Sequence, residues 1–75
     1  MAATLAALTE QHLGKLIEVD DSVMHGSEVL VTATRRVRLL AYQQLDGAVR
    51  LQDGSVPQWP CWIEWAAWRT FRVLD

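Results

Sequence analysis

Aromatic residues recur at every third position towards the C-terminal end of this sequence: Trp59, Trp62, Trp65, Trp68 and Phe71. Side chains alternate between the two faces of a β-strand, so a strand places Trp62 and Trp68 on one face and Trp65 on the other. In an α-helix, five rings at this spacing wrap about two-thirds of the circumference. Neither geometry gives a single apolar face, so the spacing predicts that the rings point in different directions whichever element forms.

The chain is too short to enclose all of these rings easily. Its 75 residues allow one domain, and a domain of this size buries only about 60% of the surface that its unfolded chain exposes. The rings either fill the core of this small domain or lie at its surface, where they contact a protein partner, a second copy or stacked bases. We expect one or two indoles to be exposed. Partner contact is assigned to Trp59, Trp62 and Trp65, with Arg69 as their neighbour.

The local preferences of this Trp-rich segment are mixed. Two prolines predict an extended connector over 57–61. β-branched and aromatic residues favour a strand over 68–74. The stretch 60–67 is compatible with a helix or a strand, because its alanines tolerate a helix while its isoleucine and tryptophan favour a strand. Cys61, between proline and tryptophan, is interpreted as a buried apolar residue rather than a nucleophile.

The N-terminal residues predict a short helix over 4–13. Three leucines in it are spaced to lie against a core: Leu5, Leu8 and Leu13. Thr9 is a suitable N-cap for a single turn over 10–12, and Gly14 can end that turn in the left-handed conformation. The apolar run 1–8 lacks the preceding basic residues of a secretory signal. No stretch reaches the roughly 20 apolar residues that span a bilayer, so we expect a cytoplasmic protein without membrane contact.

Short runs rich in β-branched residues, separated by turn residues, predict a β-meander over 15–56. In the first run, Ile17 and Val19 share one face. The run 29–42 is long for one strand, since five or six residues are typical. It therefore either bends strongly or is interrupted by a tight turn near 34–36.

The dipeptide Asp53-Gly54 is typical of a two-residue type I′ hairpin. Such a turn pairs Gln52 with Ser55. It also pairs Leu51 with Val56, so that these two apolar side chains share a face. The sequence therefore predicts a hairpin over 49–56.

The dipeptide Asp46-Gly47 is interpreted differently, because burial decides the register there. A three-residue loop over 45–47, with Gly47 in the left-handed conformation, is favoured over a two-residue loop. It aligns Val49 and Leu51 with the apolar face of the preceding strand. That face carries Val37, Leu39 and Ala41.

The opposite face of the meander is polar and basic: Arg36, Arg38, Leu40, Tyr42, Arg50 and Gln52. It fits an ordinary solvated sheet face. The alternative is a platform for an acidic partner or a single nucleic-acid strand, formed by four of these residues: Arg36, Arg38, Tyr42 and Arg50. The formal charge of −2 argues against a protein that coats nucleic acid in general.

The side chains that catalysis needs do not form a familiar pattern. His12 and His25, with Asp20 and Asp21, do not match the spacing of known metal ligands. The sequence has no phosphate-binding loop, dinucleotide fingerprint or nucleophile elbow. We therefore expect no enzymatic activity, no metal site and no cofactor.

Seven segments follow one another in this order: Leu13-Gly14-Lys15, Ile17-Glu18-Val19, Gly26, Val29-Leu30-Val31, Val37-Arg38-Leu39, Asp53-Gly54 and Val73-Leu74. In this order the chain resembles small SH3-like barrels. Such domains are common among actinobacterial phages and their hosts. Over 14–31 it is similar to KOW-type nucleic-acid-binding barrels. The resemblance implies one mainly β domain, a partly open SH3-like barrel. Its parts are an N-terminal helical segment (1–14), the meander (15–56) and the Trp-rich segment (57–75).

The favoured hypothesis is a non-catalytic protein-binding module, such as a small phage accessory protein that binds a host protein through its Trp-rich surface. One alternative is a nucleic-acid-binding SH3/KOW-like barrel that uses the basic platform. The other is a structural or virion component that assembles with itself as a homo-oligomer.

Overall fold

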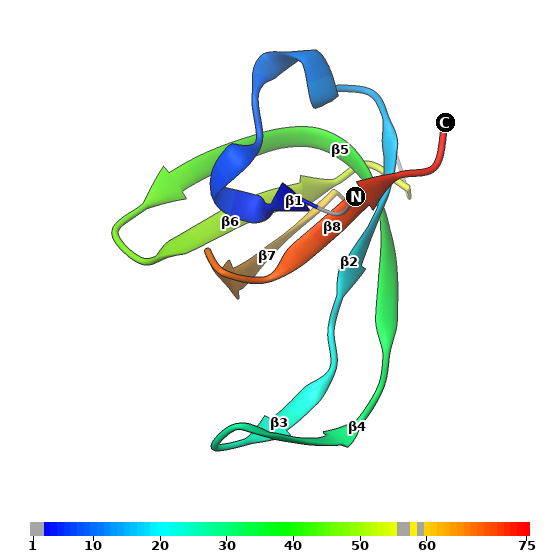
Figure 1. Ribbon diagram of the computed structural model, residues 1–75. Helices are drawn as coiled ribbons and strands as arrows, with labels where there is room; N and C mark the ends of the chain where they lie inside the picture. Colours follow the sequence, from blue (N-terminus) through cyan, green and yellow to red (C-terminus); the bar gives the residue numbers. More distant parts are fainter. Residues whose placement is uncertain (1–2, 56–57, 59) are drawn as a thin grey trace.

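The computed structural model of the chain describes residues 3–55, 58 and 60–75. As predicted, it is mainly β. In chain order the elements are β1 (Ala3–Thr4), the 3₁₀ turns η1 (Leu5–Ala7) and η2 (Glu10–His12), β2 (Leu16–Asp20), β3 (Val23–His25), β4 (Glu28–Val31), β5 (Thr34–Leu45), β6 (Ala48–Asp53), β7 (Cys61–Ala66) and β8 (Thr70–Val73). Six strands form one sheet in the order β1-β8-β2-β5-β6-β7, and β3 and β4 form a separate two-stranded sheet (Figure 1).

The larger sheet is curved and open (Figure 1). β5 is its longest strand and joins its two halves, with β2 and β8 on one side and β6 and β7 on the other. β1 and β7 lie at the two ends of the strand order and do not pair with each other. The sheet therefore does not close into a barrel.

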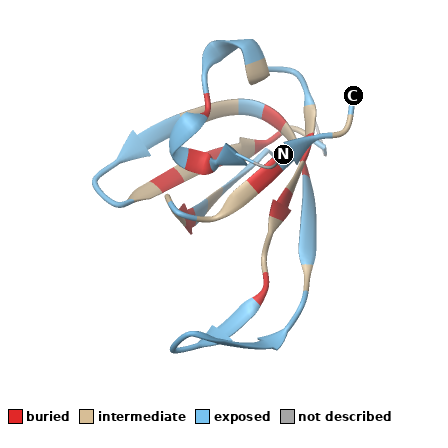
Figure 2. Cartoon of the chain, in the orientation of Figure 1, coloured by how far each residue is buried: buried red, intermediate tan, exposed pale blue. Residues whose placement is uncertain are grey.

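The hydrophobic core is formed by the side chains that point to the inner face of the curved sheet; these buried residues are red in Figure 2. It combines buried side chains from five strands and the N-terminal segment: Leu5, Leu8, Ile17, Val19, Val37, Leu39, Val49, Leu51, Trp65 and Phe71. β2 and β6 each bury every second residue, as strands with one solvated face do. The predicted shared face of Ile17 and Val19 is thereby confirmed.

The α-helix predicted over 4–13 is wrong, because only the two 3₁₀ turns form there. Leu5 and Leu8 are buried as expected, whereas Leu13 is 43% exposed. The backbone of this segment is bound to the sheet: β1 pairs with β8, and the amide of Leu5 donates to the carbonyl of Arg69 at 2.8 Å. A backbone held at a strand edge cannot make the i to i−4 hydrogen bonds of an α-helix.

The turn at Asp46-Gly47 has two residues and not the three predicted. Leu45 pairs with Ala48 across it. Gly47 has a φ of 74°, which confirms its predicted left-handed conformation and suits glycine. With a two-residue turn, the register that the burial pattern requires must be restored elsewhere in the hairpin.

A β-bulge within β5 restores the register. The pairing with β6 shifts between Leu39 and Ala41, which leaves Leu40 without a partner. The extra residue reverses the alternation of side chains, so Tyr42 pairs with Leu51 on the inner face. Tyr42 is partly buried against the core, and its predicted place on the outer face with the arginines is wrong.

The hairpin predicted at Asp53-Gly54 does not form. Gln52 pairs with β7 instead of Ser55, and Val56 lies outside the described residues. The carboxylate of Asp53 accepts hydrogen bonds from the amide and hydroxyl of Ser55 at 2.9 and 2.6 Å, as in an Asx turn. Gly54 packs against the bulge, since a Cβ there would lie 3.3 Å from the Cβ of Leu40.

The run 29–42 is interrupted at 32–33, slightly before the turn predicted near 34–36. β4 therefore separates from β5 and pairs only with β3. These two strands and their turn form a hairpin arm, residues 23–31, that projects from the body of the molecule (Figure 1).

Candidate functional site

The Trp-rich segment forms strands in its described part. β7 occupies most of 60–67, where helix and strand were both open, and β8 confirms the strand predicted over 68–74. Cys61 is exposed and not buried as predicted, since it begins an edge strand. Within β7 the burial follows strand alternation, since Trp62 is exposed and Trp65 is buried. Trp68, in the turn after β7, is exposed, and Phe71, in β8, is buried. Trp59 lies outside the described residues.

Trp65 belongs to the core, which corrects its assignment to partner contact. It is 7% exposed, and its Nε1 donates a hydrogen bond to the carboxylate of Asp21 at 2.9 Å. Asp21 lies between β2 and the hairpin arm. Trp65 therefore ties the edge strand β7 to the base of the arm and is not available to a partner.

Trp62 lies on the outer face of β7 and is 45% exposed. The guanidinium carbon of Arg50 lies 5.4 Å from the centroid of its ring, within cation–π range. The register explains the contact: Arg50 pairs with Glu64, and Trp62 is the diagonal neighbour on the same face of the sheet. The two side chains thus present apolar and cationic surface together.

Trp68 forms a second such pair in the turn between β7 and β8. It is 57% exposed, and the guanidinium carbon of Arg69 lies 4.7 Å from its ring centroid. Nη1 of Arg69 also donates to the carbonyl of Ser22 at 2.7 Å, at the base of the hairpin arm. The sequence interpretation named Arg69 but omitted Trp68, although strand spacing already grouped Trp68 with Trp62.

The hairpin arm is a second exposed surface, and the sequence interpretation missed it. Five large apolar residues of the arm are exposed, between 38% and 58%: Val23, Met24, Val29, Leu30 and Val31. The available signal was the run 29–31, where three apolar residues follow one another without the polar alternation of a half-buried strand.

The basic platform is dispersed by the curvature of the sheet and by ion pairs. Arg36 lies 3.7 Å from the carboxylate of Glu18, which also binds Arg72 at 2.8 Å. Nη1 of Arg38 donates to the carboxylate of Asp75 at 2.6 Å. With Tyr42 on the inner face and Arg50 against Trp62, these four residues do not form one open cationic face.

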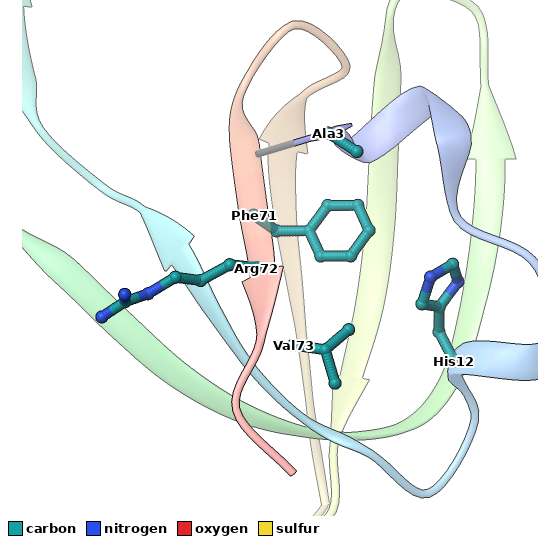
Figure 3. Close-up of a pocket in the computed structure, with 5 residues that line it drawn as sticks. All are labelled: Ala3, His12, Phe71, Arg72 and Val73. Atoms are coloured by element: carbon teal, nitrogen blue, oxygen red, sulfur yellow. The ribbon is translucent and has the colours of Figure 1, made fainter. Parts of the chain in front are cut away.

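A shallow hollow of about 430 Å³ lies beside β8 (Figure 3). Its lining is partly apolar and partly polar: Ala3, His12, Phe71, Arg72 and Val73. The edge of the His12 ring meets the ring of Phe71, with centroids 5.3 Å apart. Nδ1 of His12 accepts a hydrogen bond from the amide of Thr9 at 3.0 Å, which closes the single turn predicted over 10–12. Arg72 points away from His12 (Figure 3), and none of the five lining residues is a carboxylic acid that could act together with His12.

Two carboxylates have lowered pKa values for structural reasons. Hydrogen bonds from the hydroxyl and amide of Ser22 lower the pKa of Asp20. At Asp53 burial raises the pKa, but hydrogen bonds from Ser55 and from the amide of Arg38 outweigh it, and the pKa is lowered. Both groups are therefore ionised at neutral pH and stabilise turns.

Comparisons with known proteins add no family to this description. Family models, curated proteins and solved structures give no significant match to the chain. Within residues 3–55, 58 and 60–75, no group of His, Cys, Asp and Glu side chains could hold a metal ion. In the same residues, no helix has the length and apolar character needed to cross a membrane.

Proposed function

We propose that this chain is a non-catalytic protein-binding module that docks through its exposed indoles. The observation that carries the proposal is the presence of two indole–guanidinium pairs at the surface, Trp62 with Arg50 and Trp68 with Arg69. Tryptophan and arginine are enriched among the residues that dominate binding energy at protein interfaces. A partner that covers these rings removes from water the apolar surface that folding leaves exposed, and this burial favours binding.

The stacked arginines suit such a contact. A guanidinium resting on a ring has already lost part of its rotamer freedom, so less entropy is lost when a partner binds. Arg50 and Arg69 can then pair with carboxylates at the rim while the indoles enter an apolar groove. The proposed partner is therefore a protein with an apolar groove bordered by acidic groups.

We further infer that the sheet is an SH3-like half-barrel. The support is its connectivity: β2, β5, β6 and β7 form an antiparallel meander, and β8 returns to pair with β2. The hairpin arm then corresponds to a long connection between the first two strands of the meander. A small accessory factor of the kind that phages encode is the setting that we propose for it.

Affinity capture with the full chain tests the proposal. Wild type is compared with Trp62→Ala and with the matched control Leu13→Ala, which removes a side chain of similar exposure elsewhere on the surface. We expect one or more proteins from the lysate of the source cells to be retained by wild type and by Leu13→Ala but lost with Trp62→Ala. Because the contact is mainly apolar, retention should change little between low and high salt.

Two outcomes would contradict the proposal. If Trp62→Ala retains the same proteins as wild type, the indole is not a contact residue. If only nucleic acid is retained, and it is released steeply as salt rises, the basic alternative is the correct one.

A further inference from the structure

Every residue of the hairpin arm is exposed (Figure 2). Because three apolar residues follow one another over 29–31, apolar side chains lie on both faces of the arm. Val23 pairs with Val31, and Met24 pairs with Val29. Leu30 lies at the register shift between these two pairs and is the most exposed of the five, at 58%. An isolated two-stranded hairpin is marginally stable in water. An arm of this composition therefore gains stability when something covers it.

The base of the arm is held firmly, so it is not a loose loop. The amide of Asp21 donates to the carbonyl of Ala33 at 2.9 Å, and the amide of Ala33 donates to the hydroxyl of Ser22 at 3.3 Å. Arg69 binds the carbonyl of Ser22 from the adjacent turn. These bonds join both strands of the arm to the body of the domain. The apolar residues are thus presented in a fixed direction.

The charge of the arm favours a second copy of the same chain as the occupant. A two-fold contact uses the same patch on both copies, and residues near the axis lie close to their own counterparts, so a formal charge there meets a like charge. Residues 23–31 contain one formal charge, on Glu28, and it lies at the tip opposite His25. The remainder of the arm is neutral, so two arms can approach without repulsion.

The exposed area also agrees with a dimer. Half-exposed Val, Leu and Met residues each leave roughly 80 Å² in water, so five leave on the order of 400 Å² per copy, the size of a patch that usually binds something. Two copies together contribute about 800 Å² of apolar surface. Homodimer interfaces are about 65% apolar, so the total would be about 1,200 Å². Stable interfaces bury about 1,200–2,000 Å².

We propose that the hairpin arms of two copies of this chain pack against each other about a two-fold axis and form a homodimer. The contact consists of the five apolar residues of the arm, with Leu30 near the axis. It is separate from the indole surface of Trp62 and does not depend on the proposed protein partner.

Sedimentation equilibrium over a range of concentrations tests this proposal on the full chain. Wild type should behave as a dimer that dissociates on dilution. Leu30→Glu and Leu30→Lys each place like charges at the axis and should weaken dimerisation about 100-fold. A mixture of the two should dimerise again, because the opposite charges then meet. The matched control Leu13→Glu adds a charge to an exposed leucine outside the arm and should dimerise like wild type.

A second variant controls for the possibility that the charged variants of Leu30 fail to fold. The double replacement of Val29 and Val31 by Thr keeps β-branched side chains in the strand, and it should give a folded monomer with an unchanged circular dichroism spectrum. The proposal is overturned if wild type is a monomer at every concentration. It is also overturned if Leu30→Glu and Leu13→Glu behave alike, or if the Glu and Lys variants fail to combine. The proposal is equally contradicted if the chain is a monomer and its arm binds only a different protein.

Discussion

Truncation of Trp65 should destabilise the fold far more than truncation of the other described tryptophans. Trp65 is 7% exposed, whereas Trp62 and Trp68 are 45% and 57% exposed. Replacement of a buried tryptophan by alanine costs about 3–5 kcal/mol of unfolding free energy. It also removes the hydrogen bond from Nε1 to Asp21. Each exposed ring loses a cation–π contact of about 0.5–1 kcal/mol and the burial of only about half of its surface.

These costs are large relative to the stability of so small a domain. At about 0.05–0.15 kcal/mol per residue, a chain of 75 residues has a net stability of roughly 4–11 kcal/mol. A shift of 1 kcal/mol moves the Tm of such a domain by about 4–8 °C. Trp65→Ala should therefore lower the Tm by at least about 12 °C, and Trp62→Ala or Trp68→Ala by a clearly smaller amount.

Thermal unfolding followed by circular dichroism measures these differences, and urea unfolding gives the free energies. Trp65→Phe serves as the control, because it keeps most of the buried ring and loses the bond to Asp21, at a cost of about 1–3 kcal/mol. Equal destabilisation by the three alanine variants would refute the assignment of Trp65 to the core. A smaller effect of Trp65→Ala than of Trp62→Ala would refute it as well.

Two further expected results concern the turns. The pKa of Asp53 is lowered in the folded state, so its ionised carboxylate adds stability above its ordinary pKa of 3.8, and that contribution is lost as the pH falls through the lower folded value. Urea midpoints should therefore drop less on acidification for Asp53→Asn than for wild type, and parallel curves would contradict the role of this carboxylate. Gly47→Ala introduces a side chain at a φ of 74° and should cost about 1 kcal/mol. An unchanged Tm would contradict the left-handed turn.

Predictions from side-chain alternation are confirmed where the strand has no bulge. Ile17 and Val19 share a buried face, and the exposure of Trp62 contrasts with the burial of Trp65. Alternation is a property of the extended backbone itself and does not require knowledge of the pairing partner. The sequence therefore predicts correctly that the described tryptophans divide between core and surface.

Predictions of pairing are wrong where the deciding contact is distant in sequence. The dipeptide Asp53-Gly54 is compatible with a hairpin and with an Asx turn. The close approach of Gly54 to Leu40 decides between them, and no local pattern reveals it. The burial pattern correctly indicates one extra residue in the β5–β6 hairpin. It does not indicate that this residue is Leu40 within the strand rather than a third residue of the turn.

The hairpin arm was missed because its composition is that of a buried strand. The run 29–31 is β-branched and apolar, which predicts a strand but does not tell whether another layer covers it. Only the topology shows that β3 and β4 leave the larger sheet. The prediction for Tyr42 is wrong because the sequence does not reveal the bulge in β5. One bulge moves every later side chain of the strand to the opposite face.

Arg69 connects the two surfaces, and this determines which variants can distinguish them. Its guanidinium stacks on Trp68 and donates to the carbonyl of Ser22 at the base of the arm. Replacement of Arg69 would therefore free an exposed indole and loosen the arm together, and a loss of binding or of dimerisation could not be assigned to either. Trp62 has no such bond to the arm among its described contacts, and Leu30 lies within β4, outside the hydrogen bonds that hold the base of the arm. Variants at these two positions separate partner binding from self-association.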